Sequence, residues 1–110
     1  MIHDKVKIGG FDYKVVVTDE PLFIGNGKKI GLIEYNQCII KLSGDSEQSE
    51  QSREQCWWHE VVHGIVDDRD INIPKDRLED IVDSIAKGLY GIMKDNKFLL
   101  PGQEYTLEMR

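Results

Sequence analysis

Runs of apolar, aromatic and β-branched residues fill the first part of the chain, a pattern typical of β-strands. Residues 4–8 and 11–18 form the first two runs, and Gly9 and Gly10 lie between them. Two glycines between such runs are a signal of a two-residue hairpin turn. We therefore expect a strand pair here, followed by a loop over residues 19–28, where Pro, Asn and Gly recur.

A second pair of short apolar runs comes next along the chain. It covers residues 29–34 and 37–42, and Tyr35 and Asn36 stand at the turn between the two runs. The pattern predicts another strand pair, so that the first part of the chain builds a small, largely antiparallel sheet.

Polar residues then separate the strands from a helical pattern. Residues 43–52 are wholly polar and predict a surface loop that passes into the start of a helix. Ser52 with Gln55 fits a capping box, and Ser49 is an equally good N-cap. From residue 56 to about residue 67, apolar side chains recur at i, i+4 and i+7, as in an amphipathic helix. These side chains belong to Trp58, Val62 and Ile65.

The longest helical pattern lies in the second part of the chain. After a polar connector over residues 68–73, Pro74 is well placed in the first turn of a second helix, which we expect to end near Asn96. A last short strand is expected over residues 104–109. The second helix carries one apolar stripe. The stripe consists of Leu78, Ile81, Val82, Ile85, Leu89, Ile92 and Met93.

These elements together predict one α+β domain that spans residues 1–110. A small, largely antiparallel sheet from the strand-rich residues 1–45 packs on two main helices in residues 46–97, and residues 98–110 form a C-terminal tail. A length of 110 residues is ordinary for one domain and sufficient for a buried core without disulfides.

Composition and charge narrow the classes of function. Hydrophobic residues make up 40% of the chain and charged residues 31%, the balance of an ordinary globular protein. The formal net charge of −6 falls entirely on residues 46–110, because residues 1–45 carry equal numbers of acidic and basic side chains. An acidic chain disfavours binding to nucleic acid or to an anionic membrane. No apolar run is long enough to span a bilayer, and Cys38 and Cys56 alone give no disulfide scaffold, so we expect a reducing, cytoplasmic compartment.

The segment that carries chemistry is the H-E-x-x-H pattern His59-Glu60-Val61-Val62-His63 on the first predicted helix. Four residues make just over one helical turn, so His59 and His63 project from the same face and their imidazoles can bind one Zn²⁺. Glu60 is rotated by about 100° around the helix axis and is better placed to reach a water on the metal than the metal itself. A carboxylate there is suited to act as general base on that water.

A zinc site needs a third protein ligand, and the second helix offers acidic candidates. On a helical wheel Glu79 lies on the flank of the apolar stripe, Asp83 lies one turn later on the same side, and Asp80 points to solvent. Glu79 can therefore turn toward the first helix as a ligand, with Asp83 behind it to accept the remaining N–H of a ligand histidine. Cys56 shares the face of the two histidines and is an alternative ligand, although a lone cysteine is more often a small buried apolar group.

Together these residues resemble the gluzincin metallopeptidases, the thermolysin-like clan. Members of that family carry H-E-x-x-H followed by E-x-x-x-D on the next helix, and this chain matches the second motif with Glu79 and Asp83. The resemblance implies that zinc is bound by His59, His63 and Glu79. It also implies that Glu60 is the general base and acid, and that Asp83 orients the first histidine.

The chain is also similar over most of its length to small single-domain zincins, including short H-E-x-x-H proteins encoded by phages and other mobile elements. In zincins the last strand before the motif helix forms the rim of the cleft, and an extended substrate pairs with it. The resemblance assigns that role to residues 37–42, with Cys38, Ile39, Ile40 and Lys41 as substrate-binding positions. It implies a zinc metallopeptidase that acts on a peptide or protein substrate in the cytosol of a host cell.

The chain departs from the large gluzincins in two respects, of which the first is a short link: Glu79 follows His63 by only sixteen positions. The C-terminal subdomain that carries their oxyanion-stabilising His or Tyr has no counterpart in these 110 residues. Tyr35, Tyr105 and His3 are open candidates for that role, whereas Tyr90 lies too far along the second helix from Glu79. The alternative functions are a non-catalytic domain stabilised by zinc and a regulatory module that captures an extended peptide without cutting it.

Overall fold

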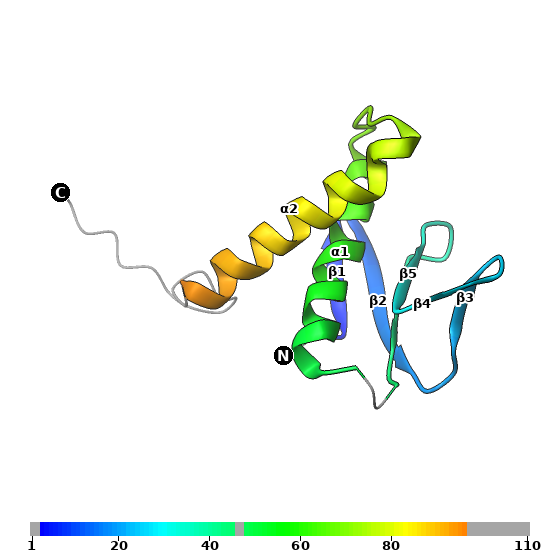
Figure 1. The fold of residues 1–110 in the computed structure, drawn as a ribbon. Helices are drawn as coiled ribbons and strands as arrows, with labels where there is room; N and C mark the ends of the chain where they lie inside the picture. The colour runs from blue at the N-terminus through cyan, green and yellow to red at the C-terminus, as the bar shows by residue number, and fades with distance from the viewer. Residues whose placement is uncertain (1–2, 46–47, 97–110) are drawn as a thin grey trace.

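The chain folds into a four-stranded sheet, a separate two-stranded hairpin and two helices (Figure 1). This computed structural model describes residues 3–45 and 48–96. The strands are β1 (Lys5–Ile8), β2 (Phe11–Thr18), β3 (Leu22–Ile24), β4 (Gly27–Lys29), β5 (Gly31–Glu34) and β6 (Ile39–Ser43). The helices are α1 (Glu50–Asp68) and α2 (Lys75–Asp95). The arrangement confirms the predicted α+β class, and the predicted tail over residues 98–110, with its strand, lies outside the described residues.

The four-stranded sheet has the order β1-β2-β6-β5 and is mostly antiparallel, as predicted. The β1–β2 hairpin turns at Gly9 and Gly10, whose φ angles of 59° and 87° lie in the left-handed region that glycine adopts without strain. β5 and β6 pair antiparallel, with Glu34 opposite Ile39. β2 and β6 pair in parallel, which the local pattern does not predict, because a parallel pair joins segments that are far apart in the chain.

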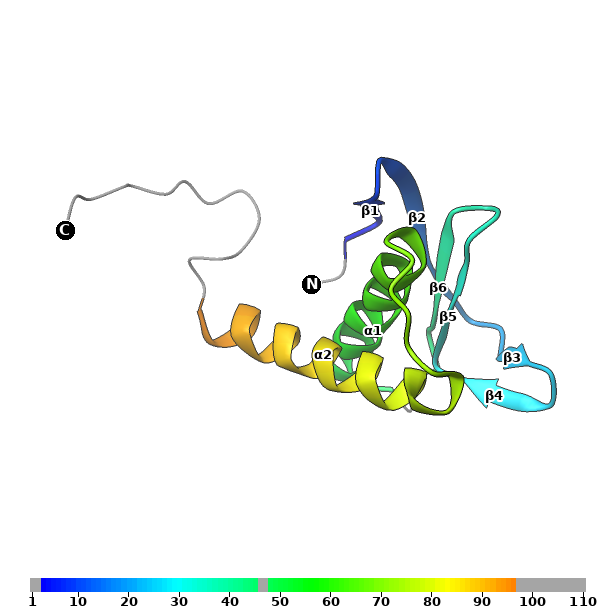
Figure 2. The ribbon, with the colours of Figure 1, turned by 90° about the horizontal axis from the view of Figure 1, so that it is seen from above.

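The β3–β4 hairpin occupies most of residues 19–28, where we expected a loop. The two strands pair antiparallel over three residue pairs, and Gly25, with a φ of 61°, supplies a left-handed conformation at the turn. The loop prediction is therefore wrong for this segment, because its Gly and Asn residues mark a tight turn between two very short strands. In Figures 1 and 2 the hairpin projects beyond the edge of the main sheet.

Helix α1 begins earlier than the apolar pattern predicts, at Glu50, and its N-cap is Ser49. The Ser49 hydroxyl oxygen accepts a hydrogen bond from the backbone N–H of Ser52, at 3.0 Å. The earlier of the two candidate caps is therefore the one used, and part of the expected polar loop forms the first turn of the helix. Helix α2 lies between Pro74 and Asn96, as predicted. Neither of these two described helices is long and apolar enough to cross a membrane.

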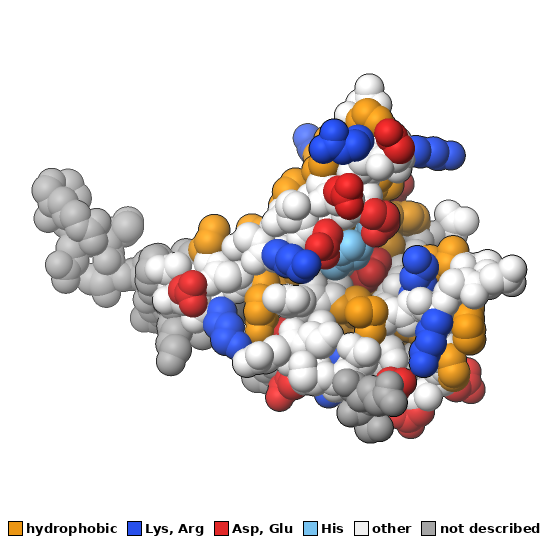
Figure 3. Space-filling view, in the orientation of Figure 1, with side chains coloured by type: hydrophobic (Ala, Val, Ile, Leu, Met, Phe, Trp, Pro, Cys, Tyr) orange, Lys and Arg blue, Asp and Glu red, His pale blue; other side chains and the backbone are white. Residues whose placement is uncertain are grey.

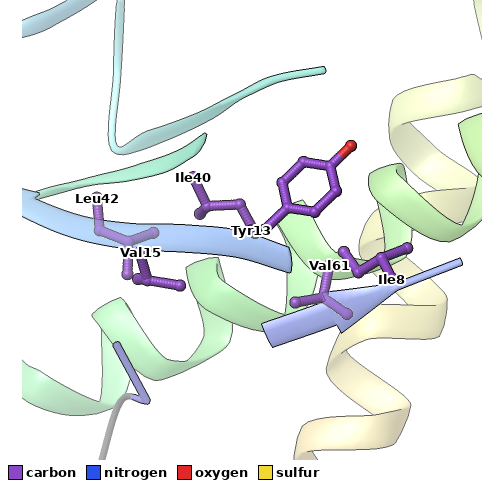
Figure 4. Packing of buried hydrophobic residues seen from close by; sticks show 6 residues of the cluster. All are labelled: Ile8, Tyr13, Val15, Ile40, Leu42 and Val61. Atoms are coloured by element: carbon purple, nitrogen blue, oxygen red, sulfur yellow. The ribbon is translucent and has the colours of Figure 1, made fainter. Parts of the chain in front are cut away.

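Helix α1 lies between the sheet and α2 (Figure 2). Its two faces pack in separate apolar clusters. On the sheet side, Val61 packs against buried strand residues, which Figure 4 shows from close by. These residues are Ile8, Tyr13, Val15, Ile40 and Leu42. On the other side, Val62 packs against Val82 and Ala86 of α2. The adjacent residues Val61 and Val62 thus join the three layers, and both lie inside the H-E-x-x-H pattern.

The buried face of α2 is rotated from the centre of its predicted apolar stripe. Val82 and Ala86 are buried, whereas Ile85 and Ile92 are 47% and 51% exposed. The two buried residues lie nearer than the two isoleucines to the flank that carries Glu79. The rotation therefore turns that flank, and the Glu79 side chain with it, toward α1.

Candidate metal centre

The two histidines of the motif lie in the middle of α1, one turn apart on the same side of the helix. The side chains of His59 and His63 are 19% and 12% exposed, and their ring centroids are 4.8 Å apart. Gly64, the next residue, faces the sheet, where a Cβ atom would lie 2.7 Å from Ile8 Cδ1 and 3.2 Å from Ile33 Cδ1. The missing side chain lets the motif helix approach the sheet closely.

Glu79 of α2 reaches across to both histidines. Its Oε2 lies 3.1 Å from His59 Nε2, and its Oε1 lies 2.9 Å from His63 Nε2. One ligand atom from each of the three residues lies within 4.8 Å of the others, a grouping that can hold a metal ion. Metal–ligand bonds of about 2.0–2.1 Å place the corners of a tetrahedron about 3.3–3.4 Å apart, and the two contacts of Glu79 with the histidines are close to this spacing. Asp80, the neighbour of Glu79, is exposed.

Asp83 lies behind the first histidine, where the sequence places it. Its Oδ1 is 3.3 Å from His59 Nδ1, so an N–H at Nδ1 can donate to the carboxylate and fix the orientation of the ring. Lys87 Nζ lies 2.9 Å from Asp83 Oδ2, one turn further along α2. Hydrogen bonding from Lys87, with a smaller contribution from His59, lowers the pKa of Asp83 and keeps this carboxylate charged.

Burial shifts the pKa of two groups at the cluster. Glu60 is only 6% exposed, and burial raises its pKa to about 7. The charges of His59 and Lys29 oppose this rise in pKa, and the charge of Glu79 adds to it. A carboxyl group with a pKa near neutrality can accept and release a proton at physiological pH. Burial also lowers the pKa of His63, against the effect of Glu79, which favours the neutral imidazole that binds metals.

The cluster opens into a pocket of about 510 Å³. Its lining comes from α1, from α2, from β5 and from the β3–β4 hairpin. Figure 3 shows this face of the molecule, on which histidine atoms reach the surface among acidic side chains, with Lys or Arg side chains on either side. The His59, His63 and Glu79 side chains all line this pocket.

The strand that borders the pocket is β5, and this corrects the predicted rim. β6 pairs with β2 on one side and with β5 on the other, so its backbone groups are already used and cannot receive a substrate strand. The correction applies to the predicted substrate positions, Cys38, Ile39, Ile40 and Lys41. Cys38 lies just before β6 with a φ of 54°, and Ile40 is fully buried. β5 is an edge of the described sheet, and its residues 31–33 line the pocket.

Of the candidates for an oxyanion contact, Tyr35 is the one that lines the pocket within the described residues. It follows β5 directly, at the turn into β6. Burial raises the pKa of its hydroxyl to about 12, and Asp67 and Glu60 add to the rise. The hydroxyl therefore keeps its proton and is available as a hydrogen-bond donor.

The other two candidates, His3 and Tyr105, and Tyr90, which helix geometry excludes, are not among the described residues that line the pocket. The His3 ring lies 6.2 Å from Trp57, centroid to centroid. The Tyr90 hydroxyl donates to Glu54 Oε1 at 3.4 Å, further along α2 as the sequence predicts. Tyr105 falls in the part of the chain that the structure does not describe.

Sequence reasoning misses the contribution of the hairpin to the pocket. Ile24 and Lys29 line it, on the two strands of a segment that we expected to be a loop. The signal that finds them is Gly25-Asn26, the two residues between the paired strands, which form a dipeptide typical of tight hairpin turns. Cys56 also lines the pocket but is not part of the His59–His63–Glu79 grouping found among the described residues.

Comparison of the chain with models of known protein families, with curated proteins and with solved structures gave no match. A function for this chain is therefore inferred from the geometry of the His59–His63–Glu79 cluster and of the pocket beside it.

Proposed function

We propose that this chain is a zinc-dependent metallopeptidase that hydrolyses a peptide bond. The observation that carries the proposal is the convergence of His59, His63 and Glu79, with the buried carboxyl group of Glu60 beside them. Three ligands alone suit a site that only stabilises a fold. A proton-accepting carboxyl group next to an open pocket is the additional feature that hydrolysis requires.

The donor set favours zinc among the common metals. Two imidazoles and one carboxylate, with a fourth position left for water or substrate, are typical of catalytic zinc sites. The lowered pKa of His63 favours a neutral imidazole that is ready to bind a cation, and the contact of His59 Nδ1 with Asp83 orients the ring of His59. When bound, zinc supplies a positive charge that polarises the substrate carbonyl and lowers the pKa of water.

Glu60 carries the two proton transfers of the reaction in this proposal. It takes a proton from water as the water oxygen bonds to the carbonyl carbon, and gives the proton to the nitrogen as the C–N bond breaks. A pKa of about 7 serves both steps. We assign to the Tyr35 hydroxyl the hydrogen bond to the carbonyl oxygen, on which negative charge develops.

The edge of β5 positions the substrate in this proposal. An extended peptide that pairs with β5, an edge strand of the sheet that the structure describes, runs along the pocket, past Glu60 and the two histidines. Backbone hydrogen bonds between β5 and the peptide do not depend on the sequence of the peptide. The side chains around the pocket determine which substrate residues the pocket accepts.

Metal content is the first test. Elemental mass spectrometry on the wild type should find one zinc per chain, and Glu79→Ala should weaken zinc binding by more than about 100-fold, because even residues behind the ligands contribute 10–100-fold. Asp80→Ala is the matched control, since Asp80 is exposed next to Glu79 and should leave zinc binding unchanged. A folded wild type that takes up no zinc would overturn the proposal.

Activity is the second test. With fluorescently labelled casein as substrate, Glu60→Gln should lower kcat by about 10²–10⁴-fold while zinc stays bound. Asp80→Asn, the same change of a carboxylate to an amide on an exposed residue, should retain activity. Equal rates for the wild type and Glu60→Gln would exclude the catalytic role. A zinc-loaded wild type that cuts no peptide would identify the metal as structural.

A further inference from the structure

The β3–β4 hairpin forms one wall of the pocket and has no role in the chemistry described above. Ile24 of β3, Lys29 of β4 and Ile30, which joins β4 to β5, all line the pocket together with His59 and Glu60. In Figure 3, basic and hydrophobic side chains lie together on the hairpin side of the histidine atoms. A substrate held along β5 therefore passes the side chains of this hairpin.

The two lysines of β4 lie on opposite faces of the hairpin. Side chains of successive strand residues alternate between the two faces. Lys28 lies on the face away from the pocket, and its Nζ is 3.5 Å from Asp45 Oδ2. Lys29 lies on the pocket face. The chain thus contains a lysine in the pocket and a matched lysine outside it, one residue apart.

Lys29 is the charged group of the pocket lining that is left for a ligand. Lys87 pairs with Asp83, Glu79 contacts the two histidines, and Glu60 is buried. Among the residues that the structure describes, Lys29 forms no ion pair, although its charge reaches Glu60 and lowers the pKa of that carboxyl group. An ammonium group without a partner on a pocket wall attracts a carboxylate.

Two exposed apolar side chains line the same pocket as this ammonium group. Ile24 and Ile30 are 59% and 43% exposed, which leaves aliphatic surface in water on the wall that carries Lys29. Covering that surface is favourable for a ligand that carries apolar side chains next to its carboxylate. The ammonium group of Lys29 and the apolar surface of Ile24 and Ile30 therefore both favour a peptide in which a carboxylate lies next to apolar side chains.

We propose that Lys29, which shares the pocket lining with Ile24 and Ile30, is a specificity-determining residue that binds a carboxylate of the substrate. The inference rests on the proposed peptidase function and names its substrate class: peptides with an acidic group between aliphatic residues. The carboxylate comes from an Asp or Glu side chain or from the free C-terminus of the peptide, and the experiment separates the two sources.

Binding tests the inference without catalysis. Three fluorescein-labelled peptides of alternating Leu and Ala are titrated against zinc-loaded Glu60→Gln protein by fluorescence anisotropy. Two are blocked at both ends and carry Glu or Gln at the centre; the third carries Gln and a free C-terminal carboxylate. One of the two carboxylate peptides should bind about two- to fivefold more tightly than the blocked Gln peptide, as expected for a solvent-accessible ion pair. Lys29→Gln should remove that difference, and Lys28→Gln should not.

The pattern of outcomes separates this inference from the proposed function. Three outcomes would overturn the role of Lys29, whatever the zinc content and the activity. All three peptides bind equally, none of them binds, or Lys28→Gln loses the difference in affinity as Lys29→Gln does. In the active protein, cleavage of a mixed peptide library should show enrichment of acidic groups near the cut bond. Lys29→Glu should reverse this preference toward Lys and Arg, whereas Lys28→Glu should keep it. An active wild type with no acidic preference would overturn the inference and leave the peptidase proposal standing.

Discussion

At the scale of single residues, Cys56 and His59 lie one helical turn apart on α1 and line the same pocket, but they have different chemistry. Burial, with a contribution from Glu60, raises the pKa of the Cys56 thiol to about 12. The sulfur packs where Gly31 of β5 has no side chain, and a Cβ there would lie 2.5 Å from Sγ. The thiol is therefore a packing group between α1 and β5, whereas a metal ligand has to be a thiolate.

We expect the Cys56 thiol of the folded protein to resist alkylation at pH 8. A thiol of pKa near 8.5 is about one-quarter thiolate at this pH, whereas a pKa of about 12 leaves about one in 10⁴. Because the pKa is raised, the labelling rate should increase with pH throughout the range in which the protein stays folded. Iodoacetamide labelling followed by mass spectrometry of the Cys56 peptide measures this rate, with the urea-unfolded chain as reference. Equally fast labelling of the folded and unfolded chains would contradict the expectation.

At the scale of elements, structure that follows from neighbouring residues could be predicted, and structure that depends on distant pairing could not. The Gly9-Gly10 hairpin and the helix between Pro74 and Asn96 follow from local turn and capping signals. The parallel pairing of β2 with β6 joins segments separated by the β3–β4 hairpin and β5. No local pattern states which strand becomes the edge, and the resemblance to zincins places the rim on the last strand before the helix, which is β6 rather than β5.

The approach of Glu79 to the two histidines could be anticipated because it follows from helix geometry. His59 and His63 share a face through their i, i+4 spacing, and Glu79 lies on the flank of an apolar stripe that has to pack on α1. Lys29 could not be placed at the pocket in the same way. Its position depends on a hairpin of two three-residue strands, too short to produce a clear periodic pattern.

The packing of α2 on α1 can be tested with two substitutions on the same helix. Val82 is fully buried against Val62, whereas Ile85 is 47% exposed. Val82→Ala should lower the free energy of unfolding by about 2 kcal/mol, since it removes two buried methyl groups and leaves a cavity. Ile85→Ala removes more atoms but should cost less than about 1 kcal/mol. Urea unfolding followed by circular dichroism measures both, and a larger loss for Ile85→Ala would show that the rotated packing face of α2 is assigned wrongly.

At the scale of the whole molecule, the candidate metal site lies where all the layers meet. The sheet packs on one face of α1 and α2 packs on the other, and both apolar clusters contain residues of the motif. The histidines come from the central layer, Glu79 comes from the outer helix, and the pocket wall comes from the strands. A cation in this position therefore crosslinks α2 to the remainder of the fold, in addition to any role in catalysis.

Removal of zinc should consequently destabilise the whole fold rather than a single loop. A ligand present at about 100 times its Kd adds about 2.7 kcal/mol to stability, which for a domain of this size corresponds to a Tm increase of about 10–20 °C. Calorimetry of the wild type with zinc and with a chelator should show this difference, and Glu79→Ala should show little of it, because one of the three ligands is missing. Hydrogen exchange should place the largest loss of protection in α2, which is joined to the sheet through α1. Chelation of zinc-bound protein could instead leave Tm and the hydrogen exchange of α2 unchanged. In that case the ion does not hold the two helices together, and it binds elsewhere than at the His59–His63–Glu79 grouping.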